Sequence, residues 1–270
     1  MSDAAPALSR LAARYDHVLL DLDGCVYVGD EPTPRAIEAV TALRTAGKGV
    51  AFVTNDGRHS AEEQVRKLWR LGFQASAEEV VTVGGALQFH LAERYGHDRA
   101  AAVVIGSPSL HRHVEHAGLR IVNDTAFASR AEVVVVGAHD GFDYAELREA
   151  AQAATRGATV VAAGRDPFFP MPDGPWPGTG AVVAAVETAA GVVAENVGKP
   201  SPAIVHAALD RLGPGRALFV GDRVETDLAA ATNAGIDGAL VLTGATTPLQ
   251  AHRAEGAIAV RDSLADLVLV

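Results

Sequence analysis

The chain alternates between short runs of apolar, often β-branched residues and longer stretches with helical spacing. Each apolar run stops at a Gly, Asp or Asn, which is typical of buried strands that end in a polar loop. Most of the helical stretches between them end at a glycine suited to a helix C-terminus. Regular alternation of strand and helix predicts parallel sheets covered by helices on both faces. The predicted strands are HVLLDLD (17–23), KGVAFVTN (48–55), AAVVIGS (101–107), AEVVVVG (131–137), ATVVAAG (158–164), RALFVGD (216–222) and GALVLTG (238–244), and the clearest helices span 36–47, 144–157 and 201–213.

The first of these strands ends in two aspartates, Asp21 and Asp23, followed by Gly24 and the chain's one cysteine, Cys25. Residues two apart on a strand point to the same side, so the two carboxylates can converge on one ligand. An acidic turn at a strand end is the simpler alternative, because Asp and Gly are common turn formers. A thiolate phosphatase would need an arginine six positions after the cysteine, where Glu31 stands, so we expect Cys25 to be a small buried side chain.

Three further segments place polar residues at strand or helix ends. VTNDGRHS (53–60) ends a strand with Thr54 and Asn55, whose hydroxyl and amide suit a phosphoryl oxygen. GKP (198–200) contains Lys199, which by itself could be a solvated surface charge. GDRVETD (221–227) contains Asp222 and Asp227, and the second of these could simply cap a helix.

Composition limits the classes of partner. The formal net charge of −10 disfavours a broad nucleic-acid surface, which would need clustered Lys and Arg. One cysteine excludes an internal disulfide, and no apolar run reaches the roughly 18 residues of a membrane span. The N-terminal segment lacks the apolar core of a signal peptide, so we expect a cytoplasmic protein without a membrane partner.

Together, the motifs DLDG, VTN, GKP and GDRVETD resemble, in that order, the four motifs of the haloacid dehalogenase superfamily. Tyr27 after the first motif, TN in the second and PGTG before the third are similar to the NagD-like group, which includes p-nitrophenyl and glycerol-phosphate phosphatases. The resemblance spans nearly the whole chain and implies a Rossmann-like doubly wound α/β core with a large inserted α/β cap domain. Lys199 comes 145 positions after Thr54, far more than one crossover needs, which independently predicts an insertion. We expect the core at 1–82 and 192–270 and the cap at 83–191.

The resemblance also implies a reaction. Asp21 would attack phosphorus to form an aspartyl-phosphate, and Asp23 would protonate the leaving oxygen and then deprotonate water. Mg²⁺ would be held by Asp21, the backbone carbonyl of Asp23, and Asp222. Lys199 would neutralise the negative charge that develops on the phosphoryl group. Thr54 and Asn55 would hold phosphoryl oxygens, and Asp227 would orient the metal ligands from behind.

Two departures from the usual pattern concern specificity. Cys25 stands where Thr or Val is common in the family, and TNDGR replaces the usual TNN. The second change adds the negative charge of Asp56 beside the expected phosphate. Arg58 could either offset that charge or contact the substrate. In the irregular segment 164–180, Asp166, Phe168, Phe169 and Trp176 could close over the substrate or could stiffen a cap connection.

These observations predict a Mg²⁺-dependent phosphomonoester hydrolase for a small phosphorylated metabolite, with glycerol phosphate or a sugar phosphate favoured. The alternatives are a non-catalytic phosphate-binding or phospho-accepting regulator, a nucleotide or pyridoxal phosphate phosphatase, a dehalogenase of the same superfamily, and a phosphomutase. The chain could also form a homodimer.

Overall fold

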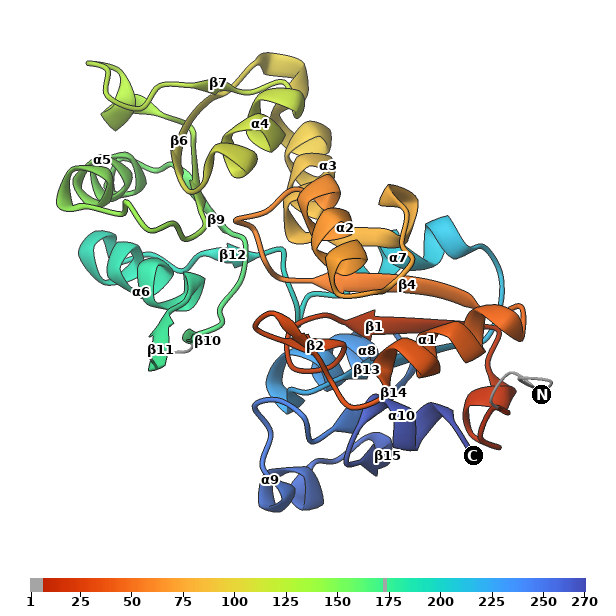
Figure 1. Cartoon of the computed structure of the whole chain (residues 1–270). Coiled ribbons are helices and arrows are strands. Elements are labelled where there is room, and N and C mark those ends of the chain that lie inside the picture. The colour runs from red at the N-terminus through yellow and green to blue at the C-terminus, as the bar shows by residue number, and fades with distance from the viewer. Residues whose placement is uncertain (1–6, 172–173) are drawn as a thin grey trace. The chain divides into compact units, whose positions relative to one another are not determined.

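The computed structural model describes residues 7–171 and 174–270, which form two compact units. The first unit contains residues up to Thr54, Ala61–Val81 and Lys199–Val270, and the second contains Asn55–Ser60 and Thr82–Gly198. Each unit has a parallel sheet with helices, so the predicted α/β class is confirmed (Figure 1).

The first unit is built on a six-stranded sheet of order β15-β14-β13-β1-β4-β5, and the pairings from β15 to β4 are parallel. Its strands are β1 (His17–Asp21), β4 (Gly49–Thr54), β5 (Val80–Thr82), β13 (Ala217–Gly221), β14 (Asp237–Val241) and β15 (Ala257–Arg261), with the small β2 (Tyr27–Val28) and β3 (Glu31–Pro32) pair beside them. Its helices are α1 (Ala36–Thr45), α2 (Ala61–Arg70), α7 (Ala203–Leu212), α8 (Ala229–Asn233), α9 (Pro248–Arg253) and α10 (Leu264–Val268).

The burial of successive residues along β1 shows that this sheet is covered on both faces. Val18 and Leu20 belong to one core cluster with residues of α1, α2 and α10, and α1 packs beside α10 (Figure 1). Leu19 is also fully buried but points to the opposite face, since neighbours on a strand alternate. A strand that is buried on both faces reads as a continuous apolar run, as this one does.

The second unit has a five-stranded sheet of order β12-β9-β8-β6-β7, in which all four pairings are parallel. Its strands are β6 (Ala101–Ile105), β7 (Arg120–Ile121), β8 (Val133–Val136), β9 (Thr159–Ala162) and β12 (Glu195–Asn196), and its helices are α3 (Val83–Tyr95), α4 (Pro108–His116), α5 (Tyr144–Thr155) and α6 (Thr179–Ala190). The three strands predicted at 101–107, 131–137 and 158–164 are present as β6, β8 and β9.

The unit boundaries differ from the expected positions at 82/83 and 191/192. Residues 192–198 join the second unit because β12 pairs with β9. Residues 55–60 join it too, since the Asn55 amide donates to Asp166 and the Ser107 hydroxyl donates to the carbonyl of Gly57. Neither segment contains a long apolar run, so the sequence pattern carried no signal for either assignment.

The segment 164–180, predicted to be irregular, contains an antiparallel pair of short strands, β10 (Phe168–Met171) and β11 (Gly174–Pro177). Residues 172 and 173 of this segment lie outside the described residues. The segment is dense in Pro and Gly, which hides the pairing from an analysis based on strand propensity.

Candidate active site

Three neighbouring strands of the first unit bring polar residues to one edge of the sheet. β1 lies between β13 and β4, and all three are parallel, so their carboxyl ends meet. Asp21 ends β1, Thr54 ends β4, and Asp222 follows β13. All three side chains are buried, which is unusual for carboxylates and indicates a built site.

Lys199 is the cation of this cluster. Its buried ammonium donates hydrogen bonds to Oδ1 of Asp21 and, over 2.7 Å, to Oδ1 of Asp227. Burial alone would lower the pKa of Lys199, but the charges of Asp21 and Asp227 outweigh burial and raise it. The lysine is therefore not the solvated surface charge that its sequence context left open.

Asp227 joins the lysine to the loop that carries Asp222. Its Oδ2 accepts the backbone N–H of Asp222 at 3.0 Å and that of Arg223 at 2.9 Å. A π-helical turn, Val224–Leu228, presents this carboxylate back toward the end of β13. Asp227 is thus a link between two elements of the site rather than a simple helix cap.

Asp222 is enclosed by backbone on several sides. Its Oδ2 accepts the N–H of Ala245 at 2.5 Å, and a Cβ added to Gly24 or Gly244 would lie 2.5 Å or 2.0 Å from that same oxygen. Gly24 also has a φ of +91°, a conformation that side chains disfavour. Only glycines allow the backbone to approach this carboxylate so closely.

The other oxygen of Asp222, Oδ1, is buried and has no hydrogen-bond partner among the described residues. Burial, together with the negative charge of Asp227, raises the pKa of Asp222 to about 6. A buried carboxylate oxygen without a donor is costly unless a cation takes that place.

The cluster fits a divalent metal ion. Carboxylate oxygens of Asp21, Asp222 and Asp227 lie within 4.8 Å of one another, and oxygen ligands are those that Mg²⁺ prefers. With all three carboxyls ionised, these carboxylates and the Lys199 ammonium carry a net charge of −2, which one divalent cation would neutralise.

Asp23 lies outside this cluster of carboxylates. Its side chain is exposed, and its Oδ2 lies 3.4 Å from the hydroxyl of Tyr27. An exposed carboxyl at the edge of the cluster suits proton transfer. The predicted use of its backbone carbonyl as a metal ligand stays a prediction.

The remaining predicted residues belong to the second unit. Nδ2 of Asn55 donates to Oδ2 of Asp166 over 3.0 Å, so these two predicted substrate-binding residues are brought together. Nε of Arg58 pairs with Oδ1 of Asp56 at 3.2 Å, which is the charge-offsetting alternative for this arginine. Burial would raise the pKa of Asp56, but the hydrogen bond from His59 and the charge of Arg58 lower it to about 2. Contacts of Asn55, Arg58 and Asp166 with a substrate stay predictions.

Cys25 is fully buried, and its Sγ lies 3.6 Å from the carbonyl oxygen of Val220. Burial, reinforced by the charge of Asp21, raises the pKa of this thiol well above its usual value. A thiol that stays protonated is a poor nucleophile. The prediction that Cys25 is a packed side chain is confirmed.

Comparison with known proteins assigns the family. A model described as haloacid dehalogenase-like hydrolase matches residues 18–120, and one described as HAD-hydrolase-like matches residues 196–267. D-glycerol 3-phosphate phosphatase of Mycobacterium tuberculosis is 37% identical over 248 residues, which cover 92% of this chain and 69% of that protein. The chain belongs to the haloacid dehalogenase-like hydrolases.

Two further comparisons agree with this assignment. Human chronophin is 37% identical over 264 residues, covering 93% of this chain and 89% of its own. The crystal structure of glycerol phosphate phosphatase from M. tuberculosis in complex with magnesium superposes with a TM-score of 0.88 at 36% identity, over 97% of this chain and 78% of that one. The resemblance to the NagD-like group of the superfamily, and the Rossmann-like core that it implied, are confirmed.

The structure of this haloacid dehalogenase-like hydrolase adds residues to the site that the sequence motifs did not reveal. Gly244 and Ala245 lie against Asp222; Gly244 is the last residue of the strand predicted at 238–244, and Ala245 follows it. The signal for them was that this strand also ends at the same edge of a parallel sheet. Tyr27 was noted as part of a motif, but its contacts depend on α2, which the motifs do not include.

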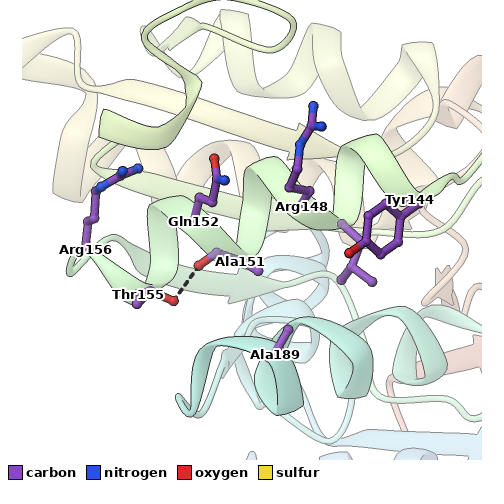
Figure 2. A pocket seen from close by; sticks show the side chains of 8 residues that line it. Tyr144, Arg148, Ala151, Gln152, Thr155, Arg156 and Ala189 are labelled. Carbon is purple, nitrogen blue, oxygen red and sulfur yellow. Dashed lines mark hydrogen bonds between the residues drawn. The ribbon is translucent and has the colours of Figure 1, made fainter.

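The hydrolase also carries a surface groove in its second unit, between α5 and α6 (Figure 2). The residues that line it are Tyr144, Leu147, Arg148, Ala151, Gln152, Thr155, Arg156 and Ala189. The predicted catalytic residues belong to the other unit, so this groove is not the candidate active site. Among the described residues, no helix combines the length and apolarity needed to cross a bilayer.

Proposed function

We propose that the chain is a Mg²⁺-dependent phosphomonoester hydrolase of small phosphorylated metabolites, acting through an aspartyl-phosphate on Asp21. The observation that supports this most directly is the buried carboxylate at the end of β1, which is paired with Lys199 beside an unpartnered oxygen of Asp222. This arrangement presents a nucleophile, a fixed positive charge and a metal-ligand atom within one small volume.

In the first half of the reaction, a carboxylate oxygen of Asp21 forms a bond to phosphorus while the ester P–O bond breaks. Asp23 gives its proton to the departing oxygen, which leaves as an alcohol. Lys199, held between Asp21 and Asp227, keeps its positive charge beside the phosphoryl group throughout. Thr54, buried at the end of β4, has a hydroxyl suited to donate to a phosphoryl oxygen.

In the second half, Asp23 takes a proton from water as that water attacks phosphorus. The bond between phosphorus and Asp21 breaks, which releases inorganic phosphate and restores the Asp21 carboxylate. Splitting one displacement into two in this way replaces a difficult step with two easier ones.

Asp21 and Asp222 would hold Mg²⁺, with the backbone carbonyl of Asp23 as a further ligand, and Asp227 would fix the geometry of the site through Lys199 and the backbone of Asp222. The bound ion supplies positive charge that neutralises the phosphate and the developing negative charge. The magnesium complex of the similar glycerol phosphate phosphatase supports this choice of ion.

Glycerol phosphate is the first substrate to test, because a D-glycerol 3-phosphate phosphatase is among the most similar relatives. A sugar phosphate is the next candidate, and nucleotide or pyridoxal phosphate remains the alternative. The cytoplasmic location, the homodimer and the function of the second unit as a cap over the substrate stay predictions.

The test is phosphate release from glycerol phosphates, sugar phosphates, nucleotides and pyridoxal phosphate, with and without Mg²⁺. Wild type is compared with Asp21→Asn and with Asp237→Asn, a surface aspartate of the same unit. We expect Mg²⁺-dependent turnover in wild type and Asp237→Asn and none in Asp21→Asn. Full activity of Asp21→Asn would refute the assigned nucleophile. Stable binding of phosphate without turnover of any substrate would favour the regulatory alternative.

A further inference from the structure

Tyr27 lies directly across a tight turn from Asp23. The N–H of Gly24 donates to the carbonyl of Tyr27 at 2.7 Å, and the N–H of Tyr27 donates to the carbonyl of Leu22 at 3.2 Å. An isolated β-bridge joins Asp23 and Tyr27. The backbone therefore holds these two residues in a fixed relation.

The side chain of Tyr27 reaches from the core to the exposed Asp23. Tyr27 is 1% exposed, and its hydroxyl oxygen lies 3.4 Å from Oδ2 of Asp23 and 3.3 Å from Oε1 of Gln64. The hydroxyl has one proton and can donate to one of these acceptors at a time. An ionised carboxylate is the stronger acceptor of the two.

Two residues of α2 hold the tyrosine in this position. Gln64 is 2% exposed and contacts the hydroxyl, while the ammonium of Lys67 lies 3.8 Å above the centre of the ring. Gln64 and Lys67 are three residues apart on the helix and so lie on the same face. A cation over the ring stabilises its position and makes the phenol a better donor.

We propose that Tyr27 is a positioning residue for Asp23, held in place by Gln64 and Lys67. This inference rests on the proposed function, in which Asp23 transfers the proton. An exposed carboxyl can rotate, and a proton donor is effective only within hydrogen-bond reach of the leaving oxygen. Donation from Tyr27 to Oδ2 restrains the carboxyl against rotation and so fixes the direction in which Asp23 presents its proton to the leaving oxygen.

The consequence depends on the leaving group, and this separates positioning from packing. An alkyl phosphate such as glycerol 3-phosphate releases a strongly basic oxygen that must be protonated. The oxygen of 4-nitrophenyl phosphate is weakly basic and leaves with little help. Loss of Asp23 positioning should therefore slow formation of the aspartyl-phosphate selectively for the alkyl substrate. Hydrolysis of that intermediate, in which Asp23 acts as the base, is the same step for both substrates.

The experiment measures kcat/KM of Tyr27→Phe for both substrates at saturating Mg²⁺, because kcat/KM covers the steps up to release of the leaving group and excludes hydrolysis of the shared intermediate. We expect kcat/KM for glycerol 3-phosphate to fall about 10-fold, a fraction of what a general acid contributes, and kcat/KM for 4-nitrophenyl phosphate to fall less than about 2-fold. If wild type does not turn over glycerol 3-phosphate, the alkyl phosphate that wild type hydrolyses best is used in its place.

The matched control is Tyr15→Phe, a second buried tyrosine of the same unit, whose hydroxyl donates to Asp237 at 2.7 Å. We expect it to leave both rates unchanged. Lys67→Met keeps the side-chain stem, removes the charge over the ring, and should show the same selective loss at about 3-fold. If Tyr27→Phe unfolds at the assay temperature, Lys67→Met provides the measurement.

An equal loss of kcat/KM on both substrates, or no loss on either, would overturn the positioning role. Failure of the proposed function has a different signature, since Asp21→Asn would then keep its activity on both substrates. Asp23→Asn serves as the reference and should show the same selectivity as Tyr27→Phe with a larger loss.

Discussion

Replacing Asp222 with asparagine should have opposite effects on the protein with and without its metal ion. Asp222 is 2% exposed, its Oδ1 has no donor among the described residues, and its pKa is raised to about 6. A carboxyl with a raised pKa destabilises the fold once it must ionise. In metal-free protein this cost grows as the pH rises from about 4 to about 6 and is complete at neutral pH.

The magnitude follows from the two pKa values. A rise from the 3.8 of the unfolded chain to about 6 corresponds to on the order of 3 kcal/mol at neutral pH. Asparagine cannot ionise, and its side-chain oxygen can still accept the N–H of Ala245. We expect the metal-free variant to be more stable than metal-free wild type by about 1–2 kcal/mol, or about 2–8 °C in Tm.

Magnesium should reverse the order. At a concentration 100 times its Kd, an ion that binds only the folded state stabilises it by about 2.7 kcal/mol, or about 5–10 °C in a unit of this size. Wild type should gain this shift, whereas Asp222→Asn lacks the ligand charge and should gain less than about 1 °C.

The assay is calorimetric unfolding at pH 7.5, in EDTA and then in a Mg²⁺ series. Asp237→Asn is the control, because hydrogen bonds from Tyr15 and Arg216 lower the pKa of that carboxyl. This control should lose stability without metal and keep the full Mg²⁺ shift. A metal-free Asp222→Asn that is less stable than wild type, and that still responds to Mg²⁺, would refute the reasoning.

Three further predictions concern Lys199 and Gly24 in the first unit and Asp56 in the second. Lys199→Met leaves Asp21 and Asp227 buried without their cation, so urea unfolding of the metal-free variant should show a loss of about 3–5 kcal/mol, and an unchanged midpoint would contradict the ion pairs. Gly24→Ala forces a methyl to 2.5 Å from Asp222, so the Mg²⁺ concentration for half-maximal activity should rise at least about 10-fold, and an unchanged value would show that the loop adapts. The pKa of Asp56 is lowered to about 2, so its contribution is present above about pH 4 and is lost as the pH falls toward 2. Acid unfolding of Asp56→Asn should therefore show up to about 2 kcal/mol less stability at neutral pH and a flatter profile below pH 4, whereas parallel profiles would rule this contribution out.

Much of the secondary structure of both units could be predicted from the sequence, for a local reason. All seven predicted strands and the three clearest helices are present, because strands buried on both faces must be continuously apolar and helices between them must repeat at helical spacing. The positions of Asp21, Thr54 and Asp222 at strand ends were equally readable. Parallel strands bring their carboxyl ends to one edge, so these residues could be expected to meet.

Tertiary structure alone decided how the charges in the site are compensated. Lys199 reaches both Asp21 and Asp227, and Ala245 approaches Asp222, because distant segments of chain fold against the same edge of the sheet. The unpartnered oxygen of Asp222 is a property of that packing and cannot be read from any single motif.

The same distinction holds for the contacts of Tyr27 and for the limits of the two units. Tyr27 belongs to a motif, but its restraint by Gln64 and Lys67 depends on how α2 packs against the turn. Likewise, residues 55–60 and 192–198 follow the second unit through a few hydrogen bonds and one short strand pairing. Periodicity and motifs report local backbone preference and burial, whereas partners that are far apart in the chain are chosen only when the elements pack.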